Sequence, residues 1–325
     1  MSDLSAQVLE SAPGPASSDA AAPRDMVWID AASFLMGSNQ HYPEERPVVR
    51  AEARGFWIDR TPVTNADFAR FVEATGWITA AEIAPRAEDY PGALPEMLKP
   101  ASLVFTPTRG PVDLRDCSAW WRFTAGADWR HPTGPDSSLA GLEQHPVVHV
   151  AWADVEAYAR WAGLDLPTEA EWELAARGGL AGAEYAWGEE LTPGGQHMAN
   201  VWQGRFPWEN LAQDGWARTS PVGFYPANGF GLHDMIGNVW EWTRDWWSMP
   251  SAGPIKSCCG PAGREAQSYD PATPDLKIPR KVLKGGSHLC APSYCRRYRP
   301  AARHAHPIDT STSHVGFRCV LRPPG

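Results

Sequence analysis

The residues best suited to chemistry are Cys290 and Cys295, five positions apart in a 325-residue chain. Pro292 lies between them and favours a turn that brings the two sulfurs together. Positive charge beside a thiol favours its thiolate, the form that coordinates metal or acts as a nucleophile. Four arginines supply that charge: Arg296, Arg297, Arg299 and Arg303. Two convergent thiolates without a histidine at ligand spacing suit a soft ion such as Cu(I). The spacing alone is also compatible with buried structural cysteines or an incidental disulfide.

The other cysteines do not form a recognisable framework. Six cysteines in a chain of this length are too few for a disulfide-stapled protein, and no pair has C-x-x-C spacing. We therefore expect a cytoplasmic protein whose cysteines stay reduced. Cys258 and Cys259 are adjacent in a variable stretch, and we interpret them as incidental.

Composition narrows the class of protein further. The net charge of -9 argues against nucleic acid as a partner. No apolar run approaches the ~20 residues that a membrane span requires, so no membrane association is expected. Residues 1–25 are rich in Ala, Ser and Pro without the pattern of a signal peptide, which predicts a disordered tail. With 29 Gly, 31 Pro and 17 Trp, residues 26–325 read as one compact, turn-rich catalytic domain.

Few regular elements are expected to position these residues. Residues 26–38 read as strand, turn and strand. Helices are predicted after Thr64, over 154–161, and after Thr168, where Glu171 completes a capping box. Residues 80–145 lack periodicity and are predicted to form a long loop region. Beyond residue 180, short aromatic segments alternate with Gly, Pro and Asn turns, which is typical of short strands and ordered loops.

Several segments together resemble one known family. GGSHLCAPSYCRRYRPAAR at 285–303, followed by GFRC at 316–319, resembles the signature of the formylglycine-generating enzymes, the sulfatase-modifying factor family. The resemblance continues through PVTNADFARFV, DWRHPTGPDS, HPVVHVAW, LPTEAEWELAARGG, ANVWQG and GNVWEWTRDWW, and covers nearly all of residues 26–322. It implies a single irregular α+β domain of the C-type-lectin-like kind.

The resemblance also implies a reaction and its residues. The cysteine of a C-x-P-x-R stretch in an unfolded sulfatase would be oxidised by O2, with a reductant, to Cα-formylglycine. Cu(I) would be held by Cys290 and Cys295, and Ser287 matches the family's active-site serine. Three further positions match residues that line the family's site: Trp240, Tyr294 and Arg303. For Trp240 and Tyr294 the plain alternative is core packing, and for Arg303 it is a structural ion pair.

Two oxygen-rich clusters match structural calcium sites of the family. The first comprises Asn200, Asp214 and the carbonyls of Val201 and Trp216. The second comprises Asp234, Glu241 and the carbonyls of Gly237 and Val239. Carboxylate, amide and carbonyl oxygens are the ligands that Ca²⁺ prefers. The alternative is that these acids cap turns.

Some positions depart from the family, and other functions stay open. Ala159, Ala176 and Pro300 stand where secreted animal members have cysteines, so Cys319 lacks its usual partner, which favours a bacterial cytosolic member. One alternative is a non-catalytic peptide-binding relative, although both site cysteines are present. An ergothioneine-type sulfoxide synthase would need an N-terminal helical bundle that does not precede residue 26. A metal-free thiol–disulfide oxidoreductase using the same pair is the strongest rival.

Overall fold

The computed structural model describes residues 7–8, 25–250, 255–256 and 264–323. The disordered tail predicted over 1–25 lies outside the described residues, except for Asp25 and for strand β1 (Gln7–Val8), which pairs with β8 (Leu180–Ala181). Cys258 and Cys259 also lie outside the described residues.

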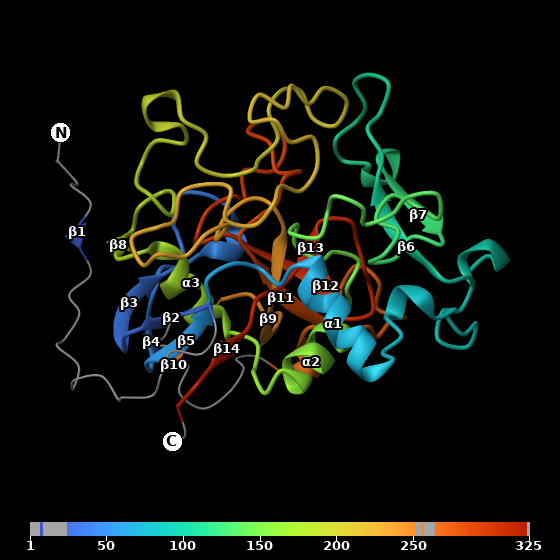
Figure 1. Ribbon diagram of the computed structural model, residues 1–325, viewed down its shortest axis with the longest axis horizontal. Helices are drawn as coiled ribbons and strands as arrows, with labels where there is room; N and C mark the ends of the chain where they lie inside the picture. The colour runs from blue at the N-terminus through green and yellow to red at the C-terminus, as the bar shows by residue number, and fades with distance from the viewer. Residues whose placement is uncertain (1–6, 9–24, 251–254, 257–263, 324–325) are drawn as a thin grey trace.

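A four-stranded sheet forms the centre of the molecule (Figure 1). Its strand order is β12-β11-β9-β13, with antiparallel pairs except between β13 and β9. These strands are β9 (Trp240–Trp246), β11 (Arg280–Lys284), β12 (Arg303–Pro307) and β13 (Val315–Gly316). β9 and β11 are buried along most of their length, as expected for the middle of a covered sheet. The two strands therefore form a rigid base for the loops that leave their ends.

Two three-stranded sheets and a hairpin complete the strand structure. The order is β14-β5-β2 in one sheet and β10-β4-β3 in the other, while β6 pairs with β7. The bounds are β2 (Met26–Ile29), β3 (Ala32–Met36), β4 (Val49–Ala53), β5 (Phe56–Asp59), β6 (Ala101–Phe105), β7 (Trp121–Ala125), β10 (Ile255–Lys256) and β14 (Val320–Leu321).

The predicted strand, turn and strand at the start of the domain exist, but they do not form a hairpin. β2 pairs with β5 and β3 pairs with β4, so the chain changes sheets at Asp30–Ala31. Each strand forms its backbone hydrogen bonds with a strand further along the chain. The periodicity of a strand's sequence shows which face is buried but does not show which strand is its partner.

The three predicted helices are confirmed, and capping explains their ends. α1 (Asn65–Thr75) begins after Thr64, whose side chain accepts from the Asp67 amide, and ends at Gly76 in the left-handed region. α3 (Glu169–Arg177) begins after Thr168 with the expected capping box and ends at Gly178. α2 (Trp152–Trp161) starts two residues earlier than predicted, because the Asp154 carboxylate caps the Ala151 amide. Short 3-10 helices cover Pro43–Glu45, Ala80–Glu82, Pro95–Met97, Cys117–Ala119, Pro193–Gly195 and Glu265–Gln267.

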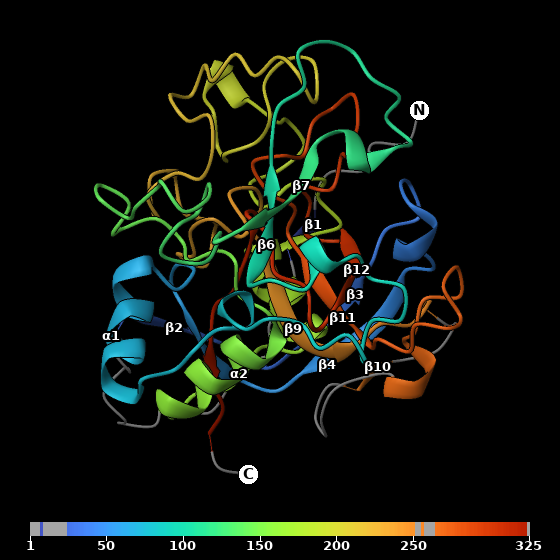
Figure 2. The ribbon, with the colours of Figure 1, turned by 90° about the vertical axis from the view of Figure 1, so that its right-hand side faces the viewer.

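The long loops between residues 180 and 240 lie above the central sheet in both views, and α2 lies below it (Figures 1 and 2). α1 lies beside the sheet, at about the height of β9. The region 80–145 is not all loop, because it contains the β6–β7 hairpin. Its two strands pair with each other over five residues, and Leu103 also bridges to Thr312. Five residues are too short a stretch for periodicity to be recognised in the sequence.

One main hydrophobic cluster runs from Ile29 to Val320, so a single core holds the chain together. A smaller cluster joins the β6–β7 hairpin to later loops and consists of Phe105, Trp120, Trp202, Phe206, Leu289 and Ala291. The predicted class, a single irregular α+β domain of the C-type-lectin-like kind, is confirmed. Within the described residues, no helix combines the length and apolar character needed to span a bilayer.

Candidate active site

The fold brings the two candidate cysteines together. The Sγ atoms of Cys290 and Cys295 are 3.2 Å apart. A disulfide would hold them at about 2.05 Å, so both are free thiols in close contact. Cys290 is buried, with 2% of its surface exposed, whereas Cys295 is half-buried. The pair thus has one inner and one outer sulfur.

Two glycines allow the loop after β11 to fold this tightly. Gly285 and Gly286 have φ values of +93° and +72°, in the left-handed region that favours glycine. A Cβ on Gly286 would lie 2.7 Å from the Arg297 carbonyl oxygen, so the chain before the first cysteine packs directly on the chain after the second. The GGS sequence is therefore a packing requirement of the site.

Backbone hydrogen bonds hold the two cysteines in place. The Cys295 amide donates to the Ala291 carbonyl at 2.9 Å, which closes the turn around Pro292. The Trp202 amide donates to the Cys290 carbonyl at 3.0 Å. The Ser287 amide points toward Cys290 Sγ at 3.5 Å, and its buried hydroxyl accepts from the Leu289 amide. Ser287 contacts Cys290 through its amide and the loop through its hydroxyl, and its catalytic role stays a prediction.

Only one of the arginines expected near the thiols contacts a sulfur. Arg297 Nη1 lies 3.7 Å from Cys295 Sγ. Glu44 holds the same guanidinium through bonds of 2.6 and 3.2 Å, and the Tyr42 ring lies 3.8 Å from its centre. Arg296 bonds to Glu184 and Tyr185, while Arg299 forms a buried bidentate pair with Glu45.

The two thiols differ in acidity. The pKa of Cys295 is lowered to about 7 by the hydrogen bond from Cys290 and by the positive charge of Arg297, which together outweigh its burial. The pKa of Cys290 is raised above its usual range by burial and by its neighbour's sulfur. The outer sulfur is therefore the one that ionises first.

Aromatic side chains support the outer edge of the site. Tyr294 is 37% exposed and stacks on Phe206 at a centroid distance of 4.5 Å, with Trp120 edge-on at 5.4 Å. Trp240 is buried in the main core and lies 5.7 Å from the His304 ring. No local pattern marks Trp120 and Phe206 as supports of Tyr294, because they lie 174 and 88 positions away from it.

Arg303 forms a buried ion pair with Glu169, and its role in substrate binding stays a prediction. Its guanidinium is bidentate to Glu169 at 2.7 and 2.8 Å and also donates to the carbonyls of Ser248 and Glu44. The residue is 6% exposed and lies over the Trp247 ring. Because most N–H donors of this guanidinium are already used in these contacts, few remain for hydrogen bonds to a peptide.

The residues of the first proposed calcium cluster already make hydrogen bonds within the protein. Asn200 donates to the Arg218 carbonyl at 2.8 Å. Asp214 accepts from the Trp216 amide at 3.0 Å and from the Tyr225 hydroxyl at 2.6 Å. The Val201 carbonyl accepts from the Gln203 side chain at 3.3 Å. The oxygens of this cluster fit a cation by type, and they also fit a set of turn caps.

The second cluster contains an unpaired oxygen. Asp234 Oδ1 is buried without a hydrogen-bond partner, while its Oδ2 accepts from the Gly223 amide at 2.7 Å. Burial raises the pKa of Asp234 to about 6. Glu241 is already bound by Arg318 through two 2.8 Å bonds and by the Trp172 indole at 2.7 Å. Asp234, with this unpaired oxygen, thus has more capacity left for a cation than Glu241 has, and the carbonyls of Gly237 and Val239 stay predicted ligands.

A copper site would rest on the two thiols alone. Among the side chains that the structure describes, no three His, Cys, Asp or Glu residues gather into a metal-binding group. Two sulfurs with one acidic thiol form a donor set that suits a soft, low-coordinate ion such as Cu(I), so the residues present fit it. The carboxylate-rich sites favoured by harder ions are not found there.

The fold and this site together define a C-type-lectin-like domain that carries a dithiol centre in the loop after β11. The family model named "Sulfatase-modifying factor enzyme 1-like domain" matches residues 12–323. The chain therefore belongs to the sulfatase-modifying factor family.

Two bacterial relatives are similar to this chain over nearly their whole length. A formylglycine-generating enzyme of Mycobacterium tuberculosis is 54% identical over 301 residues, covering 92% of this chain and 98% of that protein. One of Streptomyces coelicolor is 45% identical over 312 residues, covering 95% and 92%. Among solved structures, PvdO from Pseudomonas aeruginosa matches with a TM-score of 0.58 and 25% identity, covering 91% of this chain and 93% of that one.

Proposed function

We propose that this protein converts a cysteine in a C-x-P-x-R segment of an unfolded sulfatase into Cα-formylglycine and so activates the sulfatase. The observation that carries the proposal is the pair of free thiols 3.2 Å apart, one buried and one half-buried beside Arg297. Relatives that carry the name formylglycine-generating enzyme, one of them 54% identical, support it.

The reaction determines which co-reactants are needed. Conversion of the substrate CH2–SH group to an aldehyde removes two electrons from carbon and releases the sulfur as sulfide. O2 accepts four electrons when it is reduced to water, so a reductant must supply the other two. Cu(I), held by Cys290 and Cys295, would supply the redox chemistry that side chains lack.

The chain's own residues then bind and orient. Arg297 favours the thiolate form of Cys295, and Glu44 fixes the direction of that guanidinium. The turn from Ala291 to Cys295 and the Ser287 amide hold the two sulfurs at a set separation. Tyr294, half-exposed and rigidly stacked on Phe206, offers an aromatic surface for the client peptide next to Cys295.

A peptide assay tests this function. A C-x-P-x-R peptide is incubated with the protein, O2, a reductant and Cu(I), and mass spectrometry follows the change of CH2–SH into CHO. Cys290→Ser and Cys295→Ser are each expected to abolish conversion, whereas Cys117→Ser, an exposed free thiol, serves as the matched control. A serine peptide should not react, because a hydroxyl is a poor ligand for Cu(I). Absence of aldehyde with copper-loaded protein would overturn the proposal.

The close contact of the sulfurs also favours a second candidate, a metal-free thiol–disulfide oxidoreductase. Only a small movement separates 3.2 Å from a disulfide bond. In that case a Cu(I) chelator should leave activity unchanged and the rate should follow the thiol redox poise. Aldehyde formation separates the two, because disulfide exchange does not break the C–H bond of the substrate.

We also propose calcium as a structural ion at the Asp234 cluster and at the Asn200 cluster. A ligand that binds only the native state stabilises it by roughly 2.7 kcal/mol at a hundredfold excess over Kd. Calcium should therefore raise the melting temperature, and Asp234→Asn should reduce that gain more than Glu241→Gln, whose carboxylate is already paired with Arg318. A melting temperature indifferent to chelator and to added calcium would refute the ion at both clusters.

A further inference from the structure

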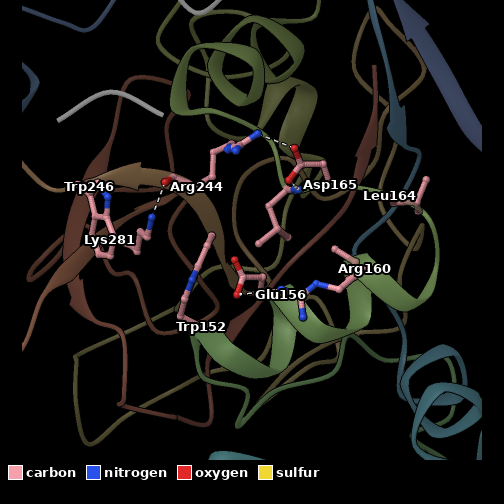
Figure 3. A pocket seen from close by; sticks show the side chains of 10 residues that line it. Trp152, Glu156, Arg160, Leu164, Asp165, Arg244, Trp246 and Lys281 are labelled. Carbon is pink, nitrogen blue, oxygen red and sulfur yellow. Dashed lines mark hydrogen bonds and ion pairs between the residues drawn. The ribbon is translucent and has the colours of Figure 1, made fainter. Parts of the chain in front are cut away.

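A pocket lies at the far end of the strands that lead to the thiols. Its volume is about 370 Å³, and it opens between α2, the loop after α2, and strands β9 and β11 (Figure 3). β9 contributes Arg244 and Trp246, and β11 contributes Lys281. β11 continues from Lys281 through Gly285 and Gly286 to Cys290, so the pocket and the dithiol centre occupy opposite ends of one strand.

Lys281 is a buried cation without a carboxylate partner. It is 4% exposed, and no Asp or Glu of the described chain lies within ion-pair distance of its Nζ. The Nζ donates to the Arg244 carbonyl at 2.6 Å and lies 3.5 Å from the Trp246 ring and 4.4 Å from the Trp152 ring. Burial lowers the pKa of Lys281 to about 8, so the amine is mainly protonated at pH 7. Asp245, Glu156 and Glu265 stabilise the ammonium from beyond ion-pair distance, and an anion in direct contact with Nζ would stabilise it further.

The other charges of the pocket are already matched. Glu156 pairs with Arg160 at 3.4 Å, and Asp165 pairs with both Arg244 and Arg322 at 2.5 Å. Figure 3 shows the Asp165–Arg244 pair across the pocket from Lys281. Among the pocket's charged side chains that the structure describes, Lys281 is the one that forms no ion pair, which suits a monoanion better than a phosphate dianion.

The remaining walls are apolar. Trp152, Ala159, Leu164 and Leu166 line the pocket, and Trp152 stands on the first turn of α2 with its ring edge-on to Trp242. A flat aromatic surface and aliphatic side chains next to one cation are complementary to a molecule with an apolar body and one acidic end.

We propose that this pocket is a binding site for a small organic carboxylate, whose acid group pairs with Lys281 and whose apolar body lies against Trp152 and Leu164. The site is separate from the dithiol centre and does not depend on the function proposed for that centre. The proposal concerns the binding of a ligand and assigns this pocket no step in the reaction.

The wild-type protein gives the first test. Phenylacetate and phenylacetamide have the same shape, but only the acid carries a charge, so calorimetric titration of both isolates the charge. Hydrogen bonds to charged groups differ from neutral ones by roughly five- to tenfold in affinity. We expect phenylacetate to bind at least about fivefold more tightly than phenylacetamide. Equal affinities, or no binding of either probe, would overturn the proposal.

Variants locate the interaction. Lys281→Met keeps an unbranched apolar chain between the two Trp rings and should lower phenylacetate affinity at least tenfold. Lys277→Met removes the same charge from an exposed position on the segment before β11 and should leave affinity unchanged. A loss of equal size in both variants would show that only net charge matters, and would refute the site.

Because Lys281 is buried, its variant could fail to fold, and a second measurement avoids that dependence. In wild-type protein, phenylacetate should shift the indole N–H resonance of Trp152, assigned with Trp152→Phe. The Trp187 indole donates to the Glu190 carbonyl outside the pocket and should not move. A Trp152 resonance that does not respond at saturating phenylacetate would contradict the proposed location.

Discussion

Replacement of Arg297 by Met should raise the pKa of Cys295 and leave the fold intact. The guanidinium lies 3.7 Å from the sulfur and is the one cation seen in contact with either thiol among the described residues. Two unit charges at that distance attract by about 4 kcal/mol at an effective dielectric constant of 20, equivalent to about three pKa units. Glu44 shares the guanidinium and Cys295 is partly exposed, so we expect a smaller change of one to two units.

The expected change is large enough to measure directly. With a pKa of about 7, half of Cys295 is thiolate at pH 7. If the pKa returns to the reference value of about 8.5, the thiolate fraction at pH 7 falls about fifteenfold. A less acidic thiolate is also a stronger nucleophile, which offsets part of the loss in rate. The midpoint of a pH titration is therefore a better measure than the rate at one pH.

Alkylation of the metal-free protein with iodoacetamide between pH 5 and 10 supplies that titration, with the modified Cys295 peptide quantified by mass spectrometry. Arg297→Met should move the midpoint upward by one to two pH units. Arg296→Met is the matched control, because Arg296 is paired with Glu184 at 3.0 Å and contacts neither sulfur. An unchanged midpoint in Arg297→Met, or an equal shift in Arg296→Met, would refute the role given to Arg297.

Three further outcomes follow from the packing. Arg299→Met leaves the buried carboxylate of Glu45 without its partner and should cost about 3–5 kcal/mol of stability, seen as a fall of about 5–7 °C in Tm. Adding Glu45→Met should recover most of that stability, whereas additive losses in the double variant would contradict the buried ion pair as the cause. Burial lowers the pKa of His149 to about 4, so the unfolded chain binds the extra proton between pH 4 and 6.5 and stability falls as pH drops through that window. In urea unfolding, His149 should account for a loss of about 2 kcal/mol in unfolding free energy between pH 7 and 5, and His149→Gln should lack that contribution. Parallel curves of unfolding free energy against pH for the wild type and His149→Gln would refute this. Gly286→Ala places a Cβ 2.7 Å from the Arg297 carbonyl at a φ of +72°, so it should abolish peptide conversion and lower Tm. Gly163→Ala is the control: its φ is also positive but the space around it is open, so it should lower stability without affecting conversion.

Local signals in the sequence were sufficient for the helices and for the thiol pair. Thr64 and Thr168 cap their helices, and Gly76 and Gly178 end them, because these interactions involve residues at most four positions apart. Cys290 and Cys295 meet across a turn of the same short range, so five-residue spacing and Pro292 predicted their contact. The many matched segments identified the family and its fold class for the same reason, since each is a local pattern.

Contacts between distant segments were decided by the tertiary structure. Sequence placed four arginines near the thiols, yet only Arg297 reaches a sulfur, because Glu45 and Glu169 hold Arg299 and Arg303 elsewhere. Those partners lie 254 and 134 positions away. The same applies to the exchange of partners between β2 and β3. The sequence shows which side chains are charged and could therefore form ion pairs. The folded chain determines which pairs form, because it buries particular partners together.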